Sequence, residues 1–271
     1  MTRLTSPYKR HWEQLEANGE GPKFASAIIE MDYNEFAAKT CEADPKFIKE
    51  ITESLYSGEA YILKSAISKK TCQYIIDKTI ETRKNSPSEF YKMLDGVPNF
   101  HRIIDSETTK KYSTRAVRHS FYFFRWNNDI LNVWQLVTPI WRVLKYVGGF
   151  DKTIYEKNIP SDLIVDRLQV VRYPSGGGGL KTHIDAYHNQ KLIFGIMLSE
   201  RGKNYKNGGF YVMNSDNQIW DMENKIESGD IVTCYPTIEH GVVDVEPEVK
   251  LDWESNDGRW FVGFYSNDTN Y

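Results

Sequence analysis

Eight short β-type runs, separated by turns of glycine, proline and asparagine, dominate the second half of the chain. They lie at residues 163–173, 181–185, 192–199, 209–213, 218–221, 231–235, 241–245 and 259–266. Short strands at this spacing are typical of antiparallel sandwiches and jelly rolls. The pattern therefore predicts a mainly β architecture for this half, in which residues from distant strands can meet at one point.

Helix signals are concentrated in the first half and predict elements that pack on one face of the sheet. Asp44 and Pro45 suit the N-cap and the first position of one helix, and Ser68 suits the N-cap of a second. Residues 113–126 have the character of an aromatic and arginine-rich strand, and the polar residues 127–129 offer caps for a third helix.

Chain length and charge narrow the class of protein. At 271 residues the chain can bury one full core, and no linker or repeat divides it, so we expect a single domain over residues 1–271. In it, residues 1–160 form a helical or mixed support region with substrate-side elements, and residues 161–271 form the core. The net charge of -3 and the pI near 6.1 provide no electrostatic basis for binding nucleic acid or an anionic membrane.

Cysteine usage and hydropathy indicate the compartment. The three cysteines are odd in number and widely spaced, which favours neither a disulfide framework nor a zinc ribbon. No apolar run is long enough to span a bilayer, and the first residues lack the apolar centre of a secretory signal. We therefore expect a cytoplasmic protein, with its oligomeric state left open.

A histidine and a carboxylate two residues apart are the first candidates for a chemical site. His183 and Asp185 follow a β run and a turn of four glycines, and on a strand such residues point to one face. Among the other histidines, His240 stands out because it opens a late strand that a jelly roll can bring across from the first pair. Two imidazoles and one carboxylate leave open positions on a metal, as in non-haem Fe(II) oxygenases.

An ordered set of motifs supports this interpretation. In chain order it consists of Leu168-Gln169-Val170-Val171-Arg172-Tyr173-Pro174-Ser175-Gly176, His183-Ile184-Asp185, Asn207-Gly208-Gly209-Phe210, Ser228-Gly229-Asp230, His240 and Arg259. With these motifs, roughly residues 160–266 resemble the Fe(II)/2-oxoglutarate-dependent dioxygenases, in the branch similar to prolyl 4-hydroxylases. The resemblance implies an α+β, mainly β fold: a double-stranded β-helix (jelly roll) with N-terminal supporting helices.

The resemblance also implies a set of ligands. Fe(II) would be held by His183, Asp185 and His240, and the cosubstrate 2-oxoglutarate would chelate the metal. Arg259 would pair with its distal carboxylate, because a guanidinium is always charged and matches a carboxylate with two hydrogen bonds. Tyr173 is expected to donate a hydrogen bond to the cosubstrate.

One spacing departs from the family pattern. Arg259 follows His240 by 259 − 240 = 19 positions rather than about ten, which indicates an inserted loop at residues 245–258. Lys250 in that loop is the weaker alternative to Arg259. A further hypothesis is that this loop and the N-terminal helices form a lid over the site.

The implied reaction consumes O2 and 2-oxoglutarate, releases succinate and CO2, and hydroxylates an unactivated C–H bond. We expect a small-molecule substrate, amino-acid-like or carboxylated, because an aromatic and cationic segment suits such a ligand. The substrate-side candidates are Arg118, Tyr122, Arg125 and His188.

Two other functions fit the same residues: a cupin-type metal enzyme that uses no 2-oxoglutarate, and a jelly-roll binding module without catalysis. In a purely structural interpretation, His183 and Asp185 are a surface salt bridge, and Arg259 is ion-paired to Asp257 or Asp268. The residues alone leave these alternatives open.

Overall fold

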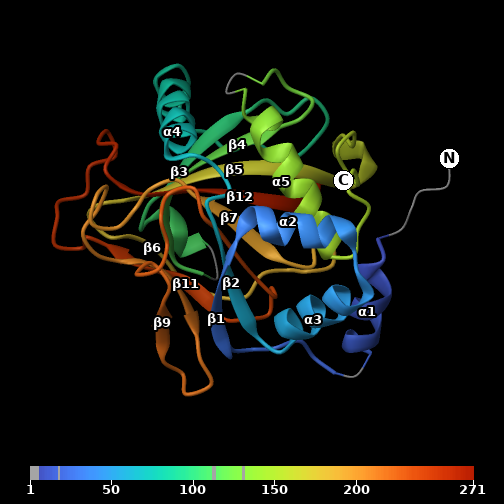
Figure 1. The fold of residues 1–271 in the computed structure, drawn as a ribbon. Coiled ribbons are helices and arrows are strands. Elements are labelled where there is room, and N and C mark those ends of the chain that lie inside the picture. Colours follow the sequence, from blue (N-terminus) through green and yellow to red (C-terminus); the bar gives the residue numbers. More distant parts are fainter. Residues whose placement is uncertain (1–5, 18, 112–113, 130–131) are drawn as a thin grey trace.

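The computed structural model describes residues 6–17, 19–111, 114–129 and 132–271. Figure 1 shows a curled sheet with most helices on one side and one helix, α4, apart at the upper left. In chain order the helices and strands are α1 (Tyr8–Glu16), β1 (Ala27–Asp32), α2 (Tyr33–Glu42), α3 (Pro45–Tyr56), β2 (Glu59–Lys64), α4 (Lys69–Lys84), β3 (Phe100–Ile104), β4 (Ala116–Phe124), α5 (Val133–Val147), β5 (Ile164–Pro174), β6 (Gly178–His183), β7 (Ile193–Met197), β8 (Gly209–Met213), β9 (Ile219–Asp221), β10 (Ile231–Cys234), β11 (His240–Val245) and β12 (Gly258–Asp268).

Helix capping follows the sequence signals closely. The Asp44 carboxylate accepts the backbone N–H groups of Lys46 and Phe47, and the Ser68 hydroxyl accepts that of Thr71. These acceptors satisfy donors that the first turn of a helix leaves unpaired. The two predicted helices are therefore confirmed as α3 and α4.

The start of α5 differs from the prediction. The helix begins at Val133, several residues after the polar run at 127–129. Even so, the Asp129 carboxylate accepts the N–H groups of Val133 and Trp134. Asp129 thus caps the helix from several residues before its start, a geometry that sequence spacing alone does not reveal.

Strand order shows how the sheet closes around a cavity. The order is β1-β2-β10-β7-β12-β5-β4-β6-β11-β8-β9, and β3 also pairs with β4. The first part of β4 pairs with β6, through Ala116 and Leu180, whereas its later part pairs with β5. Because β4 belongs to both halves, the sheet bends there into the two-layered form of a jelly roll. The predicted fold class is confirmed.

The N-terminal elements extend the larger half of the sheet. Strand β2 pairs with β1 in parallel and with β10 in antiparallel register. The sequence pattern did not predict β1, and its burial explains why. It is an edge strand without a buried residue, so it lacks a strong apolar alternation.

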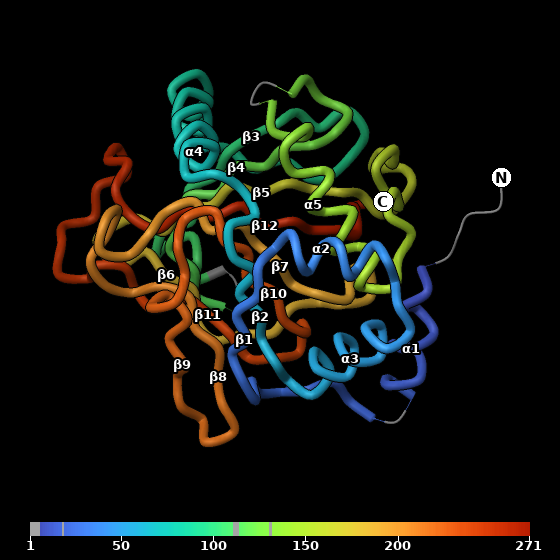
Figure 2. The backbone as a smooth tube through the Cα atoms, in the orientation of Figure 1, coloured from blue at the N-terminus to red at the C-terminus, as the bar shows by residue number. Residues whose placement is uncertain are grey.

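Helices α1, α2, α3 and α5 cover the outer side of this half, on the right in Figures 1 and 2. Trp12 of α1, Leu55 of α3 and Trp141 of α5 are buried in one core with Phe264 of β12. A smaller cluster, which includes Tyr173 and Val242, lies between the two layers. The helices therefore support the strands from outside and leave the inner side of the sheet open for a site.

The loop between β11 and β12 is held away from the cavity. The Arg83 guanidinium of α4 donates to the carbonyl oxygens of Trp253, Glu254 and Ser255, and Arg172 of β5 also donates to Trp253. None of the loop residues 246–257 lines the pocket described below. These contacts do not support the expected lid.

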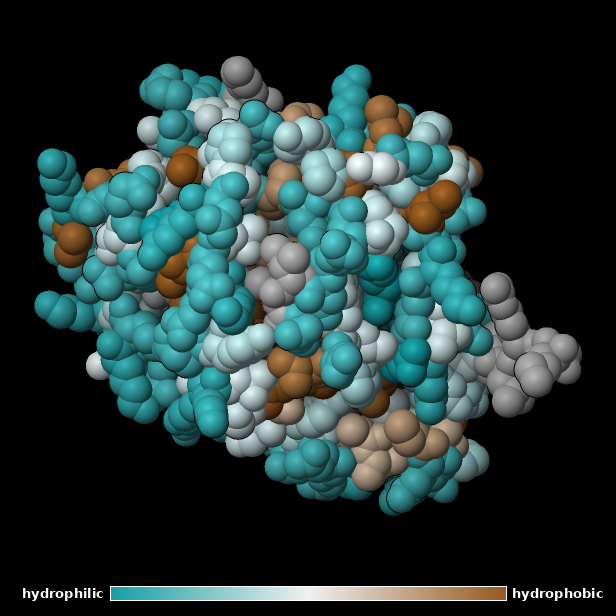
Figure 3. Space-filling model, turned by 90° about the horizontal axis from the view of Figure 1, so that it is seen from above, coloured by the Kyte–Doolittle hydropathy of each residue, from teal (hydrophilic) through white to brown (hydrophobic). Residues whose placement is uncertain are grey.

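Hydrophilic side chains cover most of the face seen from above in Figure 3. Among the described residues, every helix is too short or too polar to cross a membrane.

Candidate metal centre and pocket

Two histidines face each other across neighbouring strands. His183 is the last residue of β6 and His240 the first of β11, and the two are direct partners in the antiparallel register. Their ring centroids lie 4.4 Å apart. Residues paired in this way project to the same side of a sheet, so both imidazoles point into the cavity.

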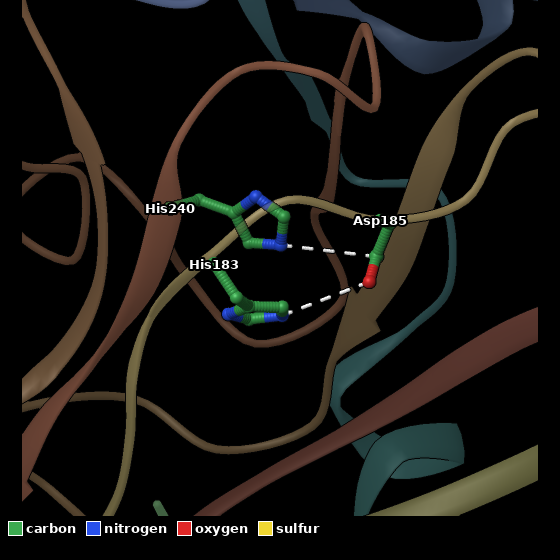
Figure 4. A group of neighbouring side chains, drawn as sticks. All are labelled: His183, Asp185 and His240. Carbon is green, nitrogen blue, oxygen red and sulfur yellow. Dashed lines mark ion pairs between the residues drawn. The ribbon is translucent and has the colours of Figure 1, made fainter. Parts of the chain in front are cut away.

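Asp185 completes the group by a different route from the one predicted. Strand β6 ends at His183, and Asp185 lies in the following loop, where its N–H donates to the carbonyl of Pro236 at 3.0 Å. The carboxylate approaches both imidazoles, with Asp185 Oδ1 3.6 Å from His183 Nε2 and Oδ2 3.8 Å from His240 Nε2 (Figure 4). One ligand atom from each of the three residues lies within 4.8 Å of the others.

Backbone carbonyls orient both rings. His183 Nδ1 lies 3.0 Å from the carbonyl oxygen of Lys181, and His240 Nδ1 lies 2.8 Å from that of Ile238. A carbonyl only accepts, so each Nδ1 carries the proton and each Nε2 presents a lone pair toward Asp185. Burial lowers the pKa of His240, which favours the neutral, ligating form. This donor set fits a first-row divalent cation such as Fe(II).

A pocket of about 560 Å³ adjoins this group. His183 and His240 form part of one wall, and alternate residues of β4, β5 and β12 form the opposite floor. Cavities of roughly 300–1,000 Å³ are usual for small-molecule sites. The floor registers are Tyr122 with Gln169, Tyr173 with Arg259, and Arg167 with Tyr265.

One end of the floor contains a buried ion pair. Arg259 and Glu223 are both nearly inaccessible, and Arg259 Nε donates to Glu223 Oε1. The same carboxylate accepts the Phe210 N–H at 2.9 Å and the Tyr205 hydroxyl at 2.7 Å. Burial lowers the pKa of Arg259, but Glu223 and Tyr205 outweigh burial, so the net pKa is raised. The partner of Arg259 is therefore neither Asp257 nor Asp268.

A glycine makes room for this pair. An added Cβ at Gly209 would lie 2.1 Å from Cγ of Glu223, and the glycine φ of +126° is itself unfavourable for other residues. Gly209 therefore lets the Glu223 side chain pass close to the backbone of β8.

Sequence comparison does not identify the chain, since no protein-family model and no curated protein matches it. Solved structures share its fold. A prolyl hydroxylase from Trichoplax adhaerens, in complex with a hypoxia inducible factor oxygen degradation domain peptide fragment, has a TM-score of 0.53 at 9% identity, covering 87% of this chain and 91% of that one. A full-length Neurospora crassa protein, in complex with alpha-KG and 5-formyluracil, has 0.51 at 13%, covering 89% and 84%. A Caulobacter crescentus protein assigned to the 2OG-Fe(II) oxygenase family has 0.51 at 14%, covering 89% and 87%.

The chain has the fold of the 2OG-Fe(II) oxygenases. At this level of identity the likeness concerns the fold, and it confirms the jelly roll predicted from the sequence motifs. In this oxygenase fold, His183, Asp185 and His240 come together as the motif order predicted, although β6 supplies only the first of them.

The four substrate-side candidates separate in the oxygenase fold. Arg118 and Tyr122 line the floor of the pocket, and His188 lines its rim while its Nε2 lies 2.9 Å from Asp268 Oδ2. Arg125 lies outside the pocket. Its Nε is 3.5 Å from Asp166 Oδ2, and its guanidinium carbon lies 4.3 Å from the centre of the Trp134 ring.

Strand alternation explains this separation. Arg118 and Tyr122 are an even number of residues apart on β4 and share a face, whereas Arg125 follows the last residue of the strand, Phe124, at an odd separation from both. Applied to β5, the same rule places Arg167 and Gln169 beside Tyr173 on the pocket face. The sequence analysis did not single out Arg167, although this period-two signal was available.

Proposed function

We propose that this protein is an Fe(II)- and 2-oxoglutarate-dependent oxygenase that hydroxylates a small molecule. The convergence of His183, Asp185 and His240 beside a pocket in the oxygenase fold carries this proposal. When bound, Fe(II) and 2-oxoglutarate supply the oxidation of a C–H bond by O2, with succinate and CO2 as coproducts. The chain's own residues then bind and orient the cosubstrate and the substrate, and they exclude water from the site.

In this proposal the two histidines and Asp185 hold Fe(II) through Nε2 and carboxylate oxygens. Their Nδ1–H bonds to the carbonyls of Lys181 and Ile238 keep the lone pairs aimed at one point. The three ligands leave the pocket side of the metal open to cosubstrate and substrate.

Arg259 and Tyr173 are the proposed cosubstrate residues. Arg259 has five N–H donors, of which Nε bonds to Glu223 and one on Nη2 contacts the Met197 sulfur at 3.0 Å. Glu223 thereby fixes the orientation of the guanidinium before the cosubstrate binds. The remaining N–H groups of Arg259 then donate to the distal carboxylate of 2-oxoglutarate. Tyr173 lies opposite Arg259 in the register and lines the same pocket.

The test is an anaerobic titration of the metal-free protein with Fe(II) and then 2-oxoglutarate, followed by visible spectroscopy. We expect the weak charge-transfer band of a chelated keto acid. The band should be absent in His183→Ala, and Arg259→Lys should need far more cosubstrate because a lysine lacks the guanidinium fork. No band at saturating iron and cosubstrate would leave the cupin-type enzyme or the binding module. Arg115→Gln, at an exposed arginine outside the pocket, is the matched control.

A further inference from the structure

Two arginines on the pocket floor lack an acidic partner. Arg118 and Arg167 both line the pocket, and neither forms an ion pair with any described residue, whereas Arg125 pairs with Asp166 and Arg259 with Glu223. The Nε atoms of Arg118 and Arg167 are buried without a hydrogen-bond partner. Buried guanidinium groups normally have such partners, so this part of the pocket is incomplete without a ligand.

Aromatic rings fix the position of Arg167. Its guanidinium carbon lies 5.3 Å from the centre of the Tyr122 ring and 5.1 Å from that of Tyr265. Its Nη2 donates to the Gln169 side-chain oxygen at 3.1 Å, and the Gln169 amide donates to Ser120 at 3.0 Å. The group is therefore held in one orientation, which reduces the entropy that a ligand must remove on binding.

Arg118 acts on the same volume from β4. Burial lowers the pKa of Arg118, but the hydroxyls of Tyr173, Tyr122 and Tyr265, with a hydrogen bond to Tyr173, outweigh burial, so its net pKa is raised. Its charge also repels that of Arg167. Burial lowers the pKa of Arg167, and Arg118 lowers it further. Two neighbouring, partly buried cations with buried Nε atoms are unfavourable unless an anion neutralises them.

Asp185 is the carboxylate that acts on Arg167, from beyond ion-pair distance. In the proposed enzyme this charge is shared with the metal, so it neutralises the arginines less when the metal is bound. The positive potential of the floor is then greatest when the metal centre is loaded.

We propose that Arg118 and Arg167 form an anion-binding subsite that takes an oxyanion group of the primary substrate. The shared chemistry is a carboxylate or phosphate that accepts hydrogen bonds from two guanidinium groups, with Tyr122 and Tyr265 flanking Arg167. The assignment of this group to the reacting substrate rests on the proposed oxygenase function; the anion site itself does not. The subsite adjoins Arg259 through Tyr173, which is hydrogen-bonded to Arg118 and is the register partner of Arg259, but the charge of Arg259 is already neutralised by Glu223.

Isothermal titration calorimetry on the metal-free full chain tests the subsite. The probes are butanoate, its neutral analogue butanamide, and inorganic phosphate, so that the carboxylate and phosphate sources are separated. The proteins are wild type, Arg118→Gln, Arg167→Gln and Arg167→Lys, with Arg115→Gln as the matched arginine control. Thermal unfolding of each variant checks that it is folded, and Arg167→Lys keeps the test valid should the glutamine variant unfold.

We expect wild type and Arg115→Gln to bind at least one oxyanion and to bind butanamide about tenfold more weakly or not at all. Arg118→Gln and Arg167→Gln should each weaken oxyanion binding about tenfold, with an intermediate effect for Arg167→Lys. Equal affinity in wild type and both glutamine variants, or equal binding of butanoate and butanamide, would overturn the proposal.

His183→Ala distinguishes this proposal from the proposed function. The variant should keep its oxyanion affinity while losing the charge-transfer band with Fe(II) and 2-oxoglutarate. A missing band in wild type with intact oxyanion binding would remove the oxygenase function and retain the anion site. A normal band without oxyanion binding would retain the oxygenase function and remove the anion site.

Discussion

The two ends of the pocket floor give their arginines opposite electrostatic surroundings: Arg259 is buried with a counter-ion, and Arg167 is partly buried without one. At one end, Glu223 neutralises Arg259 and is itself satisfied by Tyr205 and Phe210. At the other end, Arg167 lies between tyrosine rings and has no carboxylate of the described residues at ion-pair distance. Arg259 therefore has one built-in partner and keeps other donors for the proposed cosubstrate, whereas Arg167 marks a place where the ligand supplies the negative charge.

The largest effect on stability is expected from removing the ion pair between Arg259 and Glu223. Glu223→Gln leaves the buried charge of Arg259 unpaired, so the free energy of unfolding should fall by about 3–5 kcal/mol. Urea denaturation measures the change. Glu30→Gln, which removes an exposed pair with Lys225, is the control and should cost less than about 1 kcal/mol. Equal losses in the two variants would show that Glu223 does not compensate a buried charge.

His119 is a buried side chain that stays neutral instead of carrying an unpaired charge, and the pH dependence of stability can test this. Burial, with His101, Arg172 and Arg83, lowers the pKa of His119 to about 2. The unfolded chain binds a proton near pH 6.5 and the folded chain does not, so stability is lost as pH falls below 6.5. Two pH units lower, the loss from this residue should be about 2–3 kcal/mol.

His119→Gln should flatten this part of the stability curve, measured by urea denaturation between pH 6.5 and two units below. His188→Gln, at an exposed histidine, is the control for the substitution itself. The same slope in His119→Gln as in wild type would show that another group causes the acid loss.

Binding of a divalent metal should increase the affinity of the Arg118 and Arg167 subsite for oxyanions. If a divalent metal shares the charge of Asp185, butanoate or phosphate should bind about two- to fivefold more tightly with Mn(II) present, which corresponds to about 1 kcal/mol or less. Calorimetry with and without Mn(II) measures the ratio. His183→Ala should show no such increase, and an equal increase in that variant would assign it to a nonspecific salt effect.

The smallest effect is expected from removing the uncompensated charge. Arg167→Met should change the free energy of unfolding by less than about 1 kcal/mol, because the loss of packing between two tyrosines is offset by the removal of a partly buried charge that lacks an acidic partner. Urea denaturation beside Arg259→Met gives the contrast, since that change leaves Glu223 unpaired. A loss in Arg167→Met as large as in Arg259→Met would contradict the distinction between the two ends.

Sequence reasoning succeeded where local chemistry decides structure. Turns rich in glycine and proline separate the strands from β5 to β12, and Asp44 and Ser68 cap their helices as predicted. It failed at β1, where a half-exposed edge strand lacks a clear alternation.

At the site, the three candidate ligands do converge, but the loop position of Asp185 depends on a bond to Pro236 that no local pattern encodes. The partner of Arg259 was missed for a similar reason. Glu223 is 36 residues away in the chain, and only the close passage at Gly209 brings it to Arg259. Arg125, in contrast, could have been separated from Arg118 by strand parity alone.

The pairing of β2 with β10 has a consequence for the order in which the chain folds. Residues 59–64 find their antiparallel partner only at residues 231–234, so this edge of β2 stays uncovered until most of the protein has been synthesised. Contacts between such distant segments slow folding, because the chain loses the entropy of closing a long loop before the stabilising hydrogen bonds form. The early strand is therefore the segment most in need of protection on the ribosome, and its docking is expected to be a late event in folding.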